Sequence, residues 1–275
     1  AIKLPIVPLH TWLPDAHVEA PTPVSVVLAG VLLKIGGYGL LRIAYPIFPD
    51  AANEYALTLA ALGVISIVYG GFNALAQNDL KKMIAYSSVS HMGFVLLGIA
   101  SLTAEGANGA VYQMVSHGIL SSLLFLLVGV LYDRTHNRLI DNYRGLVSFM
   151  PLYTIITGVA FFASLGLPGF SGFIGELFTL MGSFQSNIIP VWLSAMGTLG
   201  IILAAAYFLW TFQRMFFGKP WAKNAKELPF LTDLSRLEKW LLLPLVLMSF
   251  ALGVFPGWLF ELSDKTVANL LKIFE

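Results

Sequence analysis

Four ionisable side chains fall well inside strongly apolar segments of this sequence, where charge is costly. They are Lys34, His91, His117 and Glu176. A charged residue at the centre of a bilayer costs roughly 2.5–3.5 kcal/mol on insertion scales, and such residues usually face a bundle interior or a water-lined cavity. Together the four predict a polar route through an apolar protein, along which protons or another cation could move.

Glycines lie close to two of these residues, and because they have no side chain they leave the helix surface there accessible to a neighbouring helix or to water. Gly36 follows Lys34, and Gly172 and Gly175 precede Glu176. Burial disfavours the charged form of an amine, so Lys34 could release and regain a proton; the alternative is a structural lysine that snorkels or holds a permanent ion pair. The alternative for Glu176 is a buried protonated acid that only hydrogen-bonds to a neighbour.

Serines surround both histidines. Residues 87–91 read SSVSH, ending at His91, and Ser116 and Ser121 lie on either side of His117. Imidazole accepts and donates protons near neutral pH, and hydroxyl groups can hold ordered water between such groups. Either histidine could relay a proton, or could simply be a hydrogen-bonded interior residue.

The composition shows what kind of elements must position these groups. The chain has 275 residues, of which 57% are hydrophobic and 11% charged, and its mean hydropathy is +0.78. These values lie outside the range of a soluble domain and predict an all-α, polytopic transmembrane bundle. The net charge of +1 argues against a nucleic-acid partner. The absence of cysteine excludes disulfides, thiolate nucleophiles and iron–sulfur or zinc–thiolate sites, so any redox centre must belong to a partner.

Seven segments are apolar and long enough to cross a bilayer, for which about 20 residues suffice. They lie at 23–46, 55–77, 83–103, 109–132, 149–186, 190–217 and 240–260. Segment 149–186 is too long for one straight crossing, and residues 165–169 (LGLPG) predict a broken helix there. Residues 3–8 look like a second break. Paired broken helices usually mark a transport site, although simple proline kinks are the alternative.

The connections between these segments differ in charge. Most of the 16 Lys and Arg fall in the loops around 14–22, 78–82, 133–147 and 214–239. Because successive spans cross the membrane in opposite directions, these loops all lie on the same side of it. The positive-inside rule predicts that this side is cytoplasmic, and topology alone would explain the basic residues.

The first 22 residues carry further ionisable groups. His10, Asp15, His17 and Glu19 are expected to belong to an interfacial loop, and Lys3, which precedes Pro5 at the start of the first break, is a weak candidate by itself. The opening residues read like the middle of a membrane segment, so we expect a piece of a longer chain.

Three long motifs resemble a known family. They are residues 8–17 (PLHTWLPDAH), 28–34 (LAGVLLK) and 79–93 (DLKKMIAYSSVSHMG). The sequence is similar over essentially its whole length to the antiporter-like membrane subunits of NADH-quinone oxidoreductase, respiratory complex I, of the subunit M or chain 4 type.

The resemblance implies a subunit of fourteen helices, built from two inverted five-helix repeats with broken helices seven and twelve. This chain would form about the second half. The family's hydrophilic axis maps onto Lys3, Lys34, His91, His117 and Glu176, so that Lys3 becomes the leading candidate. In the family a glutamate on helix five partners the helix-seven lysine, and it would lie upstream of Ala1.

On this basis we expect five regions. Residues 1–22 would be the end of a broken transmembrane helix and a cytoplasmic connection, and 23–82 the helices that complete the first inverted repeat and lead into the second. Residues 83–217 would be the second repeat with broken helix 149–186, 218–239 a cytoplasmic loop, and 240–275 the last transmembrane helix and a C-terminal tail.

The function implied by the resemblance is proton translocation coupled to quinone reduction elsewhere in the complex. No cofactor or metal is expected in this chain; FMN, iron–sulfur clusters and quinone would belong to partner subunits. The partners would be the lipid bilayer and other membrane-arm subunits, including neighbouring antiporter-like ones, in a bacterial inner membrane. The rivals are a subunit of a multisubunit cation/proton antiporter or membrane-bound hydrogenase, and a structural membrane subunit without its own proton route.

Overall fold

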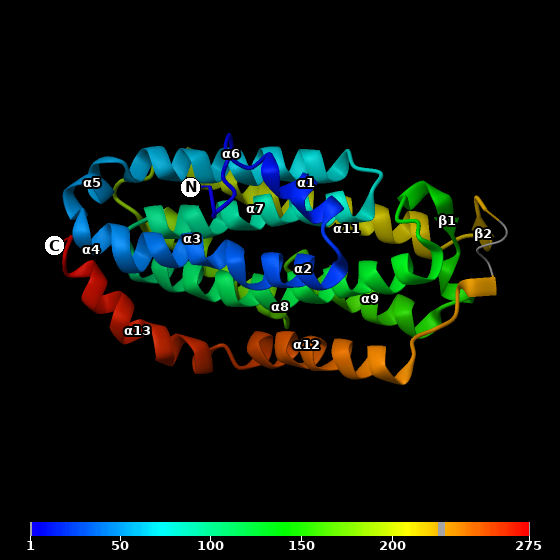
Figure 1. Cartoon of the computed structure of the whole chain (residues 1–275). Helices are drawn as coiled ribbons and strands as arrows, with labels where there is room; N and C mark the ends of the chain where they lie inside the picture. The colour runs from blue at the N-terminus through cyan, green and yellow to red at the C-terminus, as the bar shows by residue number, and fades with distance from the viewer. Residues whose placement is uncertain (1, 225–228, 275) are drawn as a thin grey trace.

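The computed structural model describes residues 2–224 and 229–274. Within them, six helices are long and apolar enough to cross a membrane: Thr22–Ile47, Ala56–Leu75 (α6), Leu80–Ala100 (α7), Ala104–Thr135 (α8), Val191–Phe216 (α11) and Arg236–Val254 (α12). They run along one direction of the molecule and form a bundle (Figure 1). The predicted all-α transmembrane architecture is confirmed.

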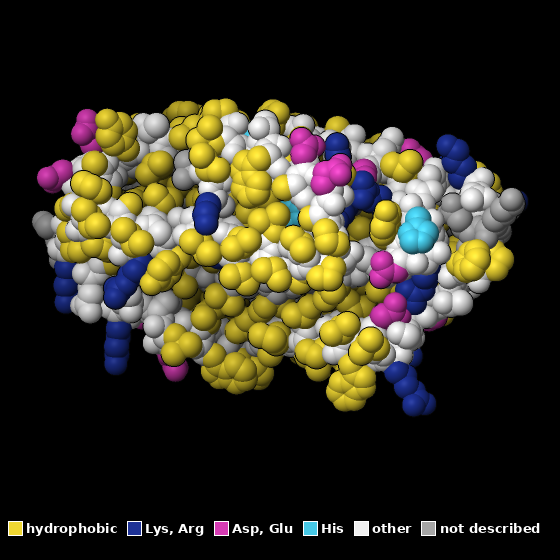
Figure 2. All heavy atoms as spheres, viewed as in Figure 1, with side chains coloured by type: hydrophobic (Ala, Val, Ile, Leu, Met, Phe, Trp, Pro, Cys, Tyr) yellow, Lys and Arg dark blue, Asp and Glu magenta, His cyan; other side chains and the backbone are white. Residues whose placement is uncertain are grey.

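Two helices form the centre of this bundle. Nearly all of α7 from Met83 to Ala100 is buried, and α8 is buried over most of its length. Helix α6 packs on α7, while α12 packs on α8 from the outside. The outer helices expose large apolar side chains such as Trp240 (77% exposed), and apolar atoms cover much of the face seen in Figure 2. A protein with apolar residues outside and buried polar residues inside is suited to lipid as its solvent.

The helix that carries Lys34 is continuous but changes its winding. It comprises Thr22–Val27 (α2), Leu28–Leu32 (η1), Leu33–Gly39 (α3), Leu40–Ala44 (η2) and Tyr45–Ile47 (α4). The segments η1 and η2 are π-helical. Such wider turns are rare, and they often occur at functional sites. Here they bracket the short stretch on which Lys34 lies.

The long apolar segment 149–186 contains two helices, Pro151–Ser164 (α9) and Ser171–Gln185 (α10). The break expected at the LGLPG motif falls between them. Gly166 and Gly169 have φ values of +82° and +99°, a region that residues with a Cβ rarely adopt. Leu167 still donates its N–H to the Phe162 carbonyl oxygen at 3.1 Å, so part of the unwound backbone is paired within the protein.

The remaining elements are short. They are Trp12–Glu19 (α1), Pro49–Glu54 (α5), Ile140–Asn142 (η3), Leu146–Ser148 (η4), Gly257–Leu271 (α13) and the antiparallel strands Tyr143–Arg144 (β1) and Trp221–Ala222 (β2). Strands β1 and β2 lie at the right-hand end of Figure 1.

Basic residues near the ends of α7 and α8 also make structural contacts. Asp79 caps α7 by accepting hydrogen bonds from the backbone N–H groups of Lys81 and Lys82, and it also pairs with Arg138 Nε at 2.5 Å. Arg134 makes two hydrogen bonds of 2.8 Å with the Glu238 carboxylate, which joins α8 to α12. The predicted topological role therefore comes with a structural one.

The C-terminal region differs from the prediction of one span over 240–260 followed by a tail. Helix α12 ends at Val254, and a separate helix, α13, begins at Gly257. Pro256, which has no N–H to donate, lies at this junction. Trp258 falls within the span expected over 240–260, but it is an exposed residue of α13.

The N-terminal region also differs. Residues 2–11 form turns, and α1 then runs from Trp12 through Pro14 to Glu19. The expected loop is instead a helix at Asp15, His17 and Glu19. His10 and His17 are also buried, with 3% and 0% of their surface exposed. The His17 ring stacks on Phe125 with centroids 4.3 Å apart. Aromatic packing therefore buries these histidines, while Asp15 and Glu19 stay exposed.

Helix α9 is capped by a residue distant in sequence. Asp233 accepts hydrogen bonds from the backbone N–H groups of Leu152 (2.9 Å), Tyr153 (3.0 Å) and Leu234 (2.8 Å). Burial acts to raise the pKa of the Asp233 carboxyl, but these three donors and the nearby charge of Lys239 outweigh it, so the pKa lies below its usual value. The ionised carboxylate thus satisfies N–H groups that the helix itself leaves unpaired.

We therefore expect Asp233→Ala to destabilise the protein by about 0.5–2 kcal/mol at neutral pH, the usual cost of replacing a helix-capping side chain by alanine. A lowered folded-state pKa means that the carboxylate stabilises the fold above the pKa of the unfolded chain. This contribution is lost as the pH falls through the folded-state value. Thermal unfolding of both proteins at pH 7 and in acid checks this: the difference in midpoint should shrink in acid. A difference that does not change with pH would contradict the assignment.

Candidate functional site

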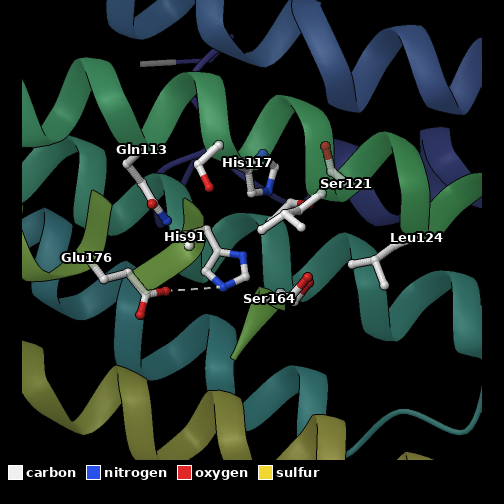
Figure 3. Close-up of a pocket in the computed structure, with 12 residues that line it drawn as sticks. His91, Gln113, His117, Ser121, Leu124, Ser164 and Glu176 are labelled. Carbon is white, nitrogen blue, oxygen red and sulfur yellow. Dashed lines mark ion pairs between the residues drawn. The ribbon is translucent and has the colours of Figure 1, made fainter. Parts of the chain in front are cut away.

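A small polar cavity lies in the middle of the bundle between α7, α8 and α10 (Figure 3). Its volume is about 10 Å³, room for on the order of one water molecule. The lining includes three of the ionisable residues singled out from the sequence: His91 from α7, His117 from α8 and Glu176 from α10. All three are at most 5% exposed.

Lys34 reaches this group from the helix Thr22–Ile47. Its Nζ lies 2.6 Å from His117 Nδ1 and also donates a hydrogen bond to the Ala29 carbonyl oxygen. Ala29 belongs to the π-helical segment η1. An ammonium can donate to both groups when Nδ1 of a neutral imidazole accepts. The backbone carbonyl thus holds the amine against the histidine.

The two histidines and the glutamate continue the row. The rings of His117 and His91 lie edge to face with centroids 5.4 Å apart. His91 Nε2 is 3.6 Å from Glu176 Oε1, the ion pair drawn in Figure 3. A separation above 3.5 Å is long for a direct hydrogen bond and suits a contact through water. Lys34, His117, His91 and Glu176 therefore form one row, called here the buried row, with groups that can pass a proton from one to the next.

Several buried polar atoms around the cavity have no hydrogen-bond partner within the described part of the chain. They include Glu176 Oε2, Gln113 Oε1 and Ser164 Oγ. Unpaired buried polar atoms are costly, and these three residues line the same cavity. The site is thus polar enough for a bridging water as well as large enough for one.

A chain of hydroxyl groups leaves the cavity toward the outer helix α12. Ser116, which lines the cavity, donates to Ser171 at 2.8 Å, and Ser171 lies 3.1 Å from Ser249. Ser171 is the first residue of α10, so the chain also fixes the start of this helix. Sequence reasoning missed Gln113, Ser164, Ser171 and Ser249. All four are polar residues within apolar segments, a weaker signal than an ionisable group there because a neutral polar side chain costs less to bury.

Lys3 is not joined to the buried row. It is exposed and lies among the N-terminal turns, and no hydrogen bond or ion pair joins it to another described residue. Its neighbour Leu4 is fully buried against the Lys34 helix, where a Cβ added at Gly36 would lie 2.5 Å from the Leu4 backbone nitrogen. Lys3 thus sits beside the Lys34 helix without reaching the cavity.

Comparison with known proteins agrees with the motifs. Residues 1–204 match the family described as NADH:quinone oxidoreductase/Mrp antiporter, TM. Over 272 residues the chain is 48% identical to NADH-quinone oxidoreductase subunit M of Rhodobacter capsulatus, covering 99% of this chain and 52% of that relative. The chain therefore spans about half the length of that relative.

Solved structures show the same fold. A chain of respiratory complex I from Thermus thermophilus with bound NADH superposes with a TM-score of 0.91 at 36% identity, covering 100% of this chain and 57% of that one. A chain of the Mrp complex from Dietzia sp. DQ12-45-1b gives 0.88 at 22% identity, covering 100% and 59%, a likeness of fold alone. The family match over most of its length shows that this chain belongs to the NADH:quinone oxidoreductase/Mrp antiporter transmembrane family.

Proposed function

We propose that this chain is part of a proton-translocating membrane-arm subunit of NADH-quinone oxidoreductase. The observation that carries the proposal is the buried row, in which Lys34 Nζ contacts His117 Nδ1 at 2.6 Å and His91 contacts Glu176 at 3.6 Å. Ionisable side chains cost free energy inside a membrane protein. Four of them side by side in the bundle are therefore best explained by a role in transport.

Each residue of the row has a proposed role. Lys34 exchanges a proton with His117, the two histidines carry it across the middle of the bundle, and Glu176 passes it to one side or to a neighbouring subunit. Lys3 exchanges protons with Lys34 through water, and so stands at the head of the route. A charge change at one group alters the proton affinity of the next, because Coulomb interactions are poorly screened in the interior.

The same relatives support a proposed setting for the subunit. We place the subunit in a bacterial inner membrane, beside other antiporter-like subunits of complex I. Quinone reduction by NADH takes place in partner subunits, which hold FMN, iron–sulfur clusters and quinone. The five regions expected from the sequence, with an inverted repeat over residues 83–217, belong to this proposal.

The step between Lys3 and Lys34 can be tested without removing either amine. A Cβ at Gly36 would lie 2.5 Å from the backbone nitrogen of Leu4 and 2.8 Å from its Cβ, so Gly36→Ala must push the Lys3 turn away from the Lys34 helix. Alanine favours a helix over glycine, so the helix itself is not weakened. We expect a severalfold loss of NADH-driven proton uptake by vesicles that contain the assembled complex.

The matched control is Gly39→Ala on the same helix, where an added Cβ meets nothing within 4 Å. This variant should pump at the unmodified rate. Equal activity of both variants would remove the proposed Lys3 step. Proton exchange driven by a sodium gradient, with no response to NADH, would instead favour the cation/proton antiporter.

A further inference from the structure

A second, larger pocket lies away from the buried row, between the helix Thr22–Ile47, α8 and α13. Its volume is about 540 Å³, within the range of roughly 300–1,000 Å³ usual for small-molecule sites. Most of its wall is apolar and includes Leu41, Val111, Met114 and Leu270. Such a wall suits a hydrocarbon chain rather than a polar metabolite.

The same pocket carries one cation. Arg42 lines it from the last part of the Thr22–Ile47 span and is exposed. Among the described residues no carboxylate forms an ion pair with Arg42. A guanidinium near the end of a membrane span favours an anionic group, and it binds phosphate oxygens with strong charge-assisted hydrogen bonds. Tyr38, Thr266 and Asn269 add hydrogen-bonding groups to the lining.

We propose that this pocket binds a membrane phospholipid, with an acyl chain along the apolar wall and the phosphate at Arg42. Helix α13 forms the outer wall, and Val267 is its one buried residue among those described. Trp258 and Leu262 on this helix are exposed and apolar, as in helices that lie in the interface of a bilayer. A lipid can therefore enter the pocket from the surrounding bilayer. Its acyl chain matches the apolar wall, and its phosphate matches Arg42.

The test uses the full-length subunit in its complex, purified, delipidated and returned to nanodiscs of phosphatidylcholine and phosphatidylglycerol. Phospholipid that survives a second detergent wash is counted by mass spectrometry. We expect Arg42→Gln to retain one phospholipid fewer per complex. Lys265→Gln, which removes an exposed cation of α13 outside the lining, should keep the full number. An unchanged number of retained phospholipids in the Arg42 variant would overturn the proposal. Arg42 would then only extend its charged group toward the membrane surface.

A second measurement identifies the occupant. A photoreactive phenylalanine analogue at Thr266, an exposed residue of the lining, should form adducts with phospholipid. Adducts with polypeptide alone would show that a protein segment fills the pocket, and would contradict the proposal. Inorganic phosphate at millimolar concentration should not reduce the lipid adducts; if it did, Arg42 would be binding free phosphate rather than a lipid headgroup.

Discussion

Glu176→Gln is expected to abolish proton uptake by vesicles that contain the assembled complex. Glutamine keeps the size of the side chain and its place beside His91, but it cannot take up or release the proton. Glu176 is 2% exposed and lies at the end of the buried row, where the structure describes no second carboxylate to replace it. We expect a loss of at least about tenfold in the rate, equivalent to roughly 1.4 kcal/mol on the barrier. The quenching of a pH-sensitive dye after addition of NADH measures it.

The control for this variant is Glu54→Gln. Glu54 is an exposed carboxylate at the end of α5, far from the cavity lining. Glu54→Gln makes the same replacement of a carboxyl group by an amide, and it should leave proton uptake unchanged. Full uptake in the Glu176 variant would support the rival in which the subunit only links proton-active neighbours.

The second large effect concerns the contact between Lys34 and His117. Lys34→Met and His117→Gln should each reduce proton uptake by about tenfold or more, because each breaks the row at the same contact of 2.6 Å. The double variant should be no slower than the slower single variant. Residues that act as one unit give non-additive effects, and a double-mutant cycle measures this directly.

Independent roles would give a different result. The losses would then multiply, to about a hundredfold in the double variant. His136→Gln is the matched control, since this exposed histidine lies at the end of α8 and outside the row. It should leave the rate unchanged, alone or combined with Lys34→Met.

The members of the buried row could be named from the sequence because they are ionisable residues in apolar segments. The order in which they lie in space could not be predicted from the sequence. Lys34 and His117 are 83 residues apart in the chain, and a distant pair is brought together only by the packing of one helix on another. The 3.6-residue period of a helix predicts which residues share its face, but not which helix it will meet.

Other features had weak signals or none. The break at the LGLPG motif was visible because glycine and proline rarely occur together inside a helix. The boundary between α12 and α13 was missed because apolar residues continue across it. The sequence does not predict the burial of His10 and His17, because that burial depends on aromatic rings from other helices. Asp233 caps a helix about 80 residues earlier, for which no local pattern exists.

If the buried row carries protons, the number of protons taken up per NADH oxidised must depend on its residues. The measurement compares the unmodified complex with the Glu176→Gln variant in sealed vesicles, with assembly checked by the recovery of all subunits. We expect this ratio to fall in the variant. An unchanged ratio, at an unchanged rate of NADH oxidation, would contradict it.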